Sequence, residues 1–232
     1  MNDLHDRLQA IRDRMTTAAQ RCGRDPTSIE LLAVSKTFPV EAIREAADAG
    51  QVLFGENKVQ EILAKAPQLP SSLHWHLIGH LQSNKVRKVL PLVKSIHSIG
   101  SLDLARDVDR IAGELGLYPK VYLEVNLADE SSKHGFNADQ LRSNLEALYA
   151  LKRLEIRGLM CIPPFDPDPE KSRPYFVQLR ALRDELETLG GTPLPLLSMG
   201  MSHDFEIAIE EGATIVRVGS AIFGERKYQA AA

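Results

Sequence analysis

The sequence is poor in cysteine. Its 232 residues include two, Cys22 and Cys161, which form no Cys-x-x-Cys pair. Structural zinc sites and disulfide-stabilised small folds need more cysteines at closer spacing, so the sequence excludes these two classes. No Asp or Glu stands in a ligand motif with the histidines of the central segment, which argues against a metal site. We interpret these histidines as polar residues at strand ends; they are His74, His76, His80 and His97.

Long apolar and long basic runs are also missing. No segment approaches the ~18 consecutive apolar residues that a membrane helix needs. The first residues, Met1 to Asp6, have neither the basic nor the apolar region of a signal peptide. The net charge is −3, so a phosphate-neutralising face for nucleic acid is not indicated. We therefore expect a soluble cytoplasmic protein that binds neither membranes nor nucleic acid.

An alternating pattern of short apolar runs and amphipathic segments fills the chain. A first helix is predicted where apolar residues recur at helical spacing and Gly23 then stops it. Eight strands are predicted after it, and we expect helices between them, such as one from Pro39 to Gly50 and one from Ser101 to Gly116. The predicted strands are Leu31–Ser35, Val52–Phe54, Trp75–Ile78, Ser95–Ile99, Val121–Val125, Ile156–Ile162, Leu196–Met199 and Thr214–Val218.

This order of elements predicts an α/β fold, a single (β/α)8 TIM barrel with an extra N-terminal helix. Strands of near-continuous apolar character with helical crossovers are typical of a parallel sheet covered by helices. Eight such units favour a closed barrel, for which about 250 residues is usual. The one proline-rich stretch, residues 163–169, follows the sixth strand and is interpreted as a rigid loop. We expect one domain over residues 1–232.

Active sites of this fold lie at the carboxyl ends of the strands, where Lys36 ends the first strand. Two interpretations remain open for this residue. It can be a solvated lysine at a strand end. It can also be a Schiff-base lysine, because burial beside cations lowers the pKa of an amine and frees it to attack a carbonyl.

The loops after the last two strands are rich in glycine and serine. Residues 198–202 follow strand seven, and Gly219 and Ser220 follow strand eight, where a short final helix can begin. This is the usual phosphate site of the fold, although ordinary turn chemistry explains the same residues. Arg217 lies inside the last strand, and such a residue is costly unless paired. It can form an ion pair with a carboxylate, or act as a fixed cation facing a heterocyclic nitrogen.

The motifs together closely resemble the pyridoxal-phosphate homeostasis protein family, also called proline synthetase co-transcribed homologues. The resemblance runs from the first helix to Tyr228. It implies a barrel like the N-terminal domain of alanine racemase, with pyridoxal 5′-phosphate (PLP) bound covalently to a lysine after the first strand. The matching segments are Leu32–Thr37, Phe54–Asn57, His74–Gly79, Leu81–Lys85, Glu124–Asn126, Ser132–Gly135, Gly158–Met160, Ser198–Asp204 and Val216–Gly224.

The resemblance also implies roles for single residues. Lys36 carries PLP as a Schiff base, and Arg217 contacts the pyridine nitrogen. The phosphate is held by Ser202, Gly219 and Ser220. The pocket is further lined at three positions with less defined roles, which are Asn57, His80 and Met199; His80 occupies a variable position of its motif and is not expected to be catalytic.

The chemistry favours a carrier of PLP over an enzyme. PLP withdraws electrons best when its ring nitrogen is protonated, and an arginine opposite that nitrogen cannot give up a proton. Racemases of this fold add a tyrosine from a C-terminal domain of a partner subunit, and we expect no such domain here. We therefore expect a role in cytosolic PLP homeostasis, with transient contact to PLP-dependent apoenzymes and no catalytic residue.

Two alternatives remain open from the sequence. A PLP-dependent amino-acid racemase would need a second acid or base near Lys36, for which His80, Tyr175 and Tyr228 are candidates. A Schiff-base aldolase would use the same lysine and phosphate loops on a sugar phosphate, without a cofactor.

Overall fold

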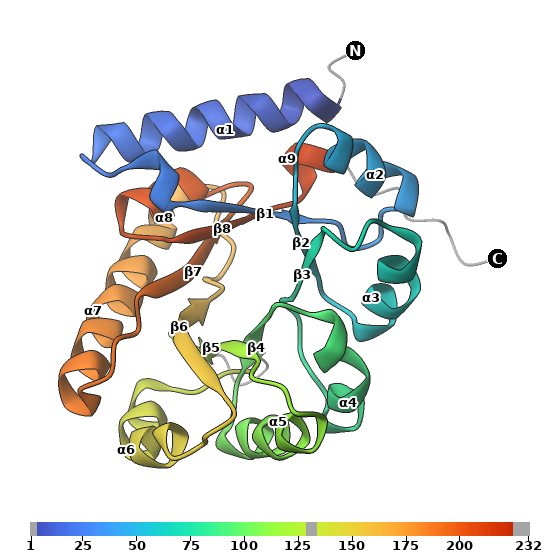
Figure 1. Cartoon of the computed structure of the whole chain (residues 1–232). Coiled ribbons are helices and arrows are strands. Elements are labelled where there is room, and N and C mark those ends of the chain that lie inside the picture. Colours follow the sequence, from blue (N-terminus) through green and yellow to red (C-terminus); the bar gives the residue numbers. More distant parts are fainter. Residues whose placement is uncertain (1–3, 129–133, 225–232) are drawn as a thin grey trace.

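Eight parallel strands close into a barrel in the order β1 to β8 (Figure 1). The computed structural model describes residues 4–128 and 134–224. Each strand lies within two residues of its predicted bounds, and the predicted barrel is confirmed. The strands are β1 Glu30–Val34, β2 Leu53–Glu56, β3 His74–Leu77, β4 Ser95–Ile99, β5 Lys120–Val125, β6 Glu155–Cys161, β7 Leu196–Met201 and β8 Ile215–Val218.

Helices surround the barrel, and the long helix α1 lies across one side of it against α8 and α9 (Figure 1). The predicted extra N-terminal helix is therefore present. The α-helices are α1 Leu4–Arg21, α2 Val40–Asp48, α3 Val59–Lys65, α4 Val86–Val89, α5 Leu102–Leu115, α6 Ala138–Tyr149, α7 Arg173–Gly190, α8 Phe205–Glu210 and α9 Ser220–Phe223.

The helix α5 shows how local sequence sets these boundaries. The Oγ atom of Ser101 accepts a hydrogen bond from the amide of Leu104 at 3.2 Å, which caps the first turn. Gly116 follows the last turn with φ of 69°, a left-handed conformation that glycine adopts without a Cβ penalty. Both predicted boundary residues of this helix are confirmed.

The hydrophobic core has two parts. The larger part fills the space between the strands and the helices. The smaller part lies inside the barrel and includes Leu32, Val34 and Met160. Four buried polar side chains from β3, β4, β7 and β8 adjoin this smaller part, and they are His76, His97, Ser198 and Arg217. The strand-end interpretation of His76 and His97 is therefore wrong, because both imidazoles are buried and hydrogen-bonded to each other.

Two kinds of feature are absent from the described residues. No helix in residues 4–128 and 134–224 combines the length and the apolar character needed to cross a bilayer. The same residues contain no group of three or more His, Cys, Asp or Glu side chains placed to hold a metal ion.

Candidate binding site at the carboxyl end of the barrel

The barrel brings most of the predicted site residues to one mouth. Lys36 follows β1 and Asn57 follows β2, while Ser202 follows β7 and Gly219 follows β8. Since β7, β8, β1 and β2 are consecutive neighbours in the closed barrel, these four loops are adjacent at their carboxyl ends. Parallel strands direct all four loops to the same side, as the sequence predicted.

The last two loops are tied to each other and to β1. The amide of Gly219 donates a hydrogen bond to Oγ of Ser202 at 3.1 Å. A Cβ added to Gly219 would lie 3.1 Å from the carbonyl oxygen of Val34, two residues before Lys36. The absence of a side chain at Gly219 therefore lets this loop lie against the end of β1.

A short helix begins at this point, as predicted. In α9, Gly219 is the N-cap, and the amides of Ser220 and Ala221 donate to no carbonyl of the described chain. The first amides of a helix have no partner within it, so they can bind an anion. The loops after β7 and β8 thus present amides and a hydroxyl to the same mouth.

The turn after β7 requires glycine. Gly200 has φ of 90°, and a Cβ on it would lie 2.5 Å from Cβ of Ala208. Asp204 closes the turn by accepting a hydrogen bond from the amide of Met201 at 2.7 Å. Met199 is fully buried in the core outside the barrel, because its neighbour Ser198 points inward and side chains alternate along a strand. Any contact of Met199 with a ligand at this mouth therefore comes from its backbone.

Lys36 is half-buried in a tight turn that is hydrogen-bonded to α3. The following residue, Thr37, has φ of 70°, a left-handed conformation that is unfavourable for a β-branched residue. The amide of Thr37 donates to Oε2 of Glu61 on α3 at 2.7 Å. Such strain persists only where surrounding contacts fix it, so the turn around Lys36 is held in one conformation by its neighbours.

A buried polar cluster supplies those contacts. The ammonium of Lys65 donates to the carbonyl of Ser35 at 3.0 Å, to Glu56 at 2.7 Å and to Glu61 at 2.7 Å. The hydroxyl of Ser35 also donates to Oε1 of Glu56 at 2.7 Å. These bonds join the end of β2, the helix α3 and the residue before Lys36.

Glu56 is the most enclosed member of this cluster. Its side chain is fully buried, and Oε2 has no hydrogen-bond partner in the described chain. Burial raises the pKa of Glu56 to about 7, against the opposing attraction of Lys65. The sequence analysis identified neither Glu56 nor Lys65 as part of the site.

Arg217 lies at the floor of the mouth, where its side chain is 3% exposed. One guanidinium nitrogen donates to Oγ of Ser198 at 2.6 Å, and another donates to the carbonyl of Cys161 at 2.8 Å. Burial lowers the pKa of Arg217 from its ordinary value, but arginine stays charged in proteins. No described carboxylate forms an ion pair with it, so neutral acceptors hold the cation in place of the structural ion pair that the sequence left open.

Two further residues border a cavity of about 290 Å³ at this mouth, Asn57 and His80. The Oδ1 atom of Asn57 is buried and has no hydrogen-bond partner among the described residues. His80 is exposed, and its ring stacks on His134 with centroids 3.8 Å apart.

The other candidates from the sequence lie elsewhere. Tyr175 lies half-buried on α7. The predicted motif residues Ser132 and Lys133, and the candidate Tyr228, lie outside the described residues.

Comparisons with known proteins agree with this geometry. The family model of the alanine racemase N-terminal domain matches residues 7–227. The pyridoxal phosphate homeostasis protein of Aquifex aeolicus is 46% identical over 224 residues, 96% of this chain and 98% of that protein. The structure of PipY from Synechococcus elongatus with PLP bound is 42% identical, with a TM-score of 0.86, and the match covers 96% of this chain and 100% of that one.

A more distant structure shows the fold alone. The alanine racemase of Clostridium difficile matches 99% of this chain and 58% of its own length, with a TM-score of 0.75 at 14% identity. The match to the homeostasis proteins, by contrast, extends over nearly the whole length of both chains. With a barrel of the alanine racemase N-terminal type and this full-length similarity, the chain belongs to the pyridoxal phosphate homeostasis protein family.

Proposed function

We propose that this chain, as one barrel domain over residues 1–232, binds PLP as a Schiff base on Lys36 and carries it for PLP homeostasis. The observation that carries the proposal is the contact between the Gly219 loop and the end of β1. The first amides of α9, which donate to no carbonyl of the described residues, therefore lie close to the turn that bears Lys36. The Aquifex aeolicus protein named for PLP homeostasis and the PLP-bound PipY structure support the same proposal.

The residues present fit this cofactor. Ser202, Ser220 and Ala221 offer a hydroxyl and two amides for a phosphate at the side of the mouth next to β1. The buried Oδ1 of Asn57 needs a donor that the described chain does not provide. The anionic tail of a flat polar ligand would accept hydrogen bonds from Ser202 and the α9 amides, and a donor of the same ligand would bond to Oδ1 of Asn57. Arg217 would lie at the floor between these two groups.

The chemistry follows from one amine and one cation. When bound, PLP supplies an aldehyde that a primary amine can attack and a ring that withdraws electrons. The Nζ atom of Lys36 would form a carbon–nitrogen double bond to the aldehyde carbon, and the aldehyde oxygen would leave as water. Arg217 cannot transfer a proton to a ring nitrogen that faces it, so it would hold the ring without strengthening electron withdrawal. This arrangement supports storage of the cofactor better than turnover of an amino acid.

The absorbance spectrum of the purified protein with PLP tests the attachment. We expect an imine band in the wild type and in the control variant Lys88→Ala, because Lys88 is exposed on α4 and lines neither the cavity beside Asn57 nor the one at the start of the strands. We expect the band to be lost or shifted in Lys36→Ala. Identical spectra without an imine band in any of the three proteins would refute the proposal.

Two further assays address the carrier role. We expect no exchange of the α-proton of alanine for deuterium in the presence of the PLP-loaded protein, whereas a racemase would exchange it. We expect the PLP-loaded protein to restore the activity of a PLP-dependent apoenzyme, through transient contact of the two proteins. Exchange at a catalytic rate would favour the racemase alternative.

A further inference from the structure

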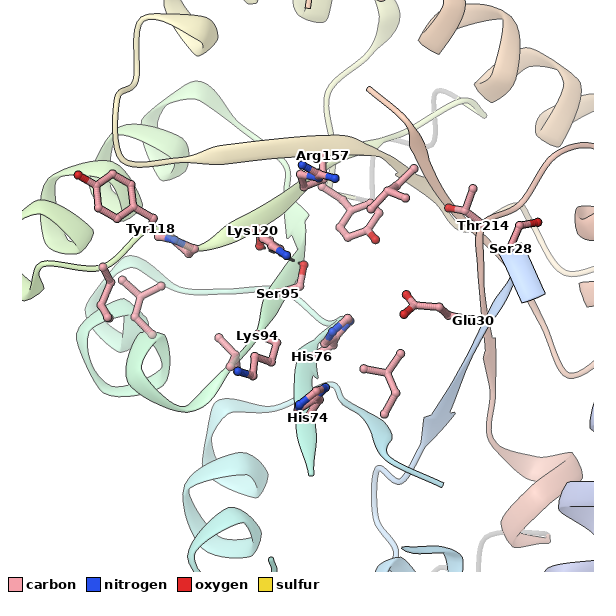
Figure 2. Close-up of a pocket in the computed structure, with 17 residues that line it drawn as sticks. Ser28, Glu30, His74, His76, Lys94, Ser95, Tyr118, Lys120, Arg157 and Thr214 are labelled. Atoms are coloured by element: carbon pink, nitrogen blue, oxygen red, sulfur yellow. Dashed lines mark hydrogen bonds between the residues drawn. The ribbon is translucent and has the colours of Figure 1, made fainter. Parts of the chain in front are cut away.

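A second cavity lies at the opposite mouth of the barrel, where the strands begin (Figure 2). It has a volume of about 660 Å³ and is lined by residues of the strands β1 to β7 and by Thr214, which precedes β8. Glu30 is its one acidic lining residue within the described chain. The basic lining residues are more numerous, and they are His74, His76, Lys94, Lys120 and Arg157.

The charges of this cavity are only partly balanced. Arg157 forms an ion pair with Glu155 at 2.9 Å, but its Nε atom is buried without a hydrogen-bond partner in the described chain. Lys94 and Lys120 form no ion pair with a described carboxylate. Excess positive charge in a recess with low-dielectric walls attracts anions. Figure 2 shows Lys94, Lys120 and Arg157 around the recess, with Glu30 at its other side.

A continuous hydrogen-bonded chain joins this cavity to Arg217 through the interior of the barrel. Arg217 donates to Oγ of Ser198 at 2.6 Å, and this Oγ lies 2.8 Å from Nδ1 of His97. The Nε2 atom of His97 lies 2.8 Å from Nδ1 of His76, which lines the cavity. All four side chains are buried, and burying so many polar groups costs stability unless each is hydrogen-bonded. Departures from apolar packing of this kind are expected at functional sites.

The permanent cation favours one direction for the hydrogen bonds of this chain. A guanidinium can only donate, so Ser198 accepts from Arg217, and its own hydroxyl hydrogen is available to Nδ1 of His97. We assign to the two histidines the tautomers that continue this direction. His97 then carries its proton on Nε2 and donates to Nδ1 of His76. His76 in turn carries its proton on Nε2 and presents an N–H donor to the cavity. Burial lowers the pKa of His76 to about 3 and that of His97 well below its ordinary value, so both rings are neutral near pH 7.

We propose that the mouth at the start of the strands binds a small oxyanion, a phosphate or a carboxylate, between the His76 Nε2–H donor and the side chains of Lys120 and Arg157. Such a ligand accepts a hydrogen bond from His76 and balances the positive charges of Lys120 and Arg157. Because the donor is oriented through Ser198 and His97, the site communicates with Arg217 on the other side of the barrel.

Titration of the full chain with inorganic phosphate tests the site, with the ¹⁵N signals of the His76 ring as the readout. The PLP-loaded protein is used, and the titration is repeated on Ser202→Ala, which alters only the opposite mouth. We expect Lys120→Met to raise the Kd of phosphate about tenfold, since it removes a charged hydrogen-bond donor. We expect Glu30→Gln to lower the Kd, and the exposed control Lys88→Met to leave it unchanged.

A variant outside the cavity tests the oriented chain. Ser198→Ala removes the link between Arg217 and His97, so we expect a higher Kd although no lining residue changes. Ser98→Ala is the matched control, because this buried serine on β4 bonds to the carbonyl of Gly79 and lies off the chain. Acetate in place of phosphate shows which oxyanion class the site prefers.

Two results would overturn the inference. The first is the absence of any phosphate-dependent shift of the His76 signals in the wild type. The second is an equal Kd in the wild type and in Lys120→Met, which folds normally because Lys120 is exposed. A failure of PLP binding would appear separately, as a missing imine band, and would leave the Ser202→Ala titration valid.

Discussion

Acid should weaken this fold through its buried histidines. His76 is 7% exposed, and burial lowers its pKa from 6.5 to about 3, with His74 and Lys120 adding electrostatic repulsion. Between these two pH values the unfolded chain binds a proton on this ring and the folded chain does not. The free energy of unfolding is therefore intact above pH 6.5 and falls as the pH drops below 6.5.

The size of the loss follows from the shift. One pKa unit corresponds to about 1.4 kcal/mol, so His76 alone accounts for a loss of about 2 to 3 kcal/mol between pH 7 and pH 4.5. His97 is fully buried and its pKa moves in the same direction, so it adds to the loss. A loss of this size is a large part of the stability of an ordinary domain.

Urea unfolding of the wild type and of His76→Gln at several pH values measures this effect. We expect the difference in free energy of unfolding between the two proteins to change by about 2 to 3 kcal/mol from pH 7 to pH 4.5. The contributions of the other titrating groups are common to both proteins and cancel in this difference. The control His5→Gln removes an exposed histidine of α1. Parallel pH profiles for the wild type and His76→Gln would refute the reasoning.

Three other substitutions have defined outcomes. Lys65→Met should lower the free energy of unfolding by about 3 kcal/mol at pH 8, measured in urea, because the ionised Glu56 loses its buried cation; a loss below about 1 kcal/mol would contradict this. Gly200→Ala should destabilise the fold by more than about 2 kcal/mol through its positive φ and the contact with Ala208, and an unchanged Tm would count against it. Ser202→Ala should raise the Kd of PLP about tenfold, measured by absorbance titration, and an unaltered Kd would remove Ser202 from the phosphate site.

The fold was predictable because its signals are local. Short apolar strands, the serine cap at Ser101 and the glycine stop at Gly116 each depend on a few neighbouring residues. The repeat of these units then leaves few ways to close a parallel sheet. The convergence of the candidate site residues at one mouth was predictable in the same way, because strand-end positions converge in any such barrel, and Lys36, Ser202 and Gly219 follow strands.

The supporting polar groups were not predictable, because they depend on contacts between distant segments. In the sequence, Glu56 resembles an ordinary acid at a strand end and Lys65 an ordinary lysine of a helix. They meet only because α3 packs against the turn after β1. His97 and Ser198 are 101 residues apart, and no pattern in the sequence places their side chains in contact. Met199 is a different case, because its motif predicts the loop after β7 but not that its side chain packs outside the barrel.

The most direct test of the account locates the covalent link in the unmodified sequence. The protein is incubated with PLP, reduced with borohydride to convert the imine to a stable amine, and digested for mass spectrometry of its peptides. We predict that the pyridoxyl mass is on the peptide that contains Lys36. Stoichiometric labelling of another lysine, with the Lys36 peptide unlabelled, would contradict the account.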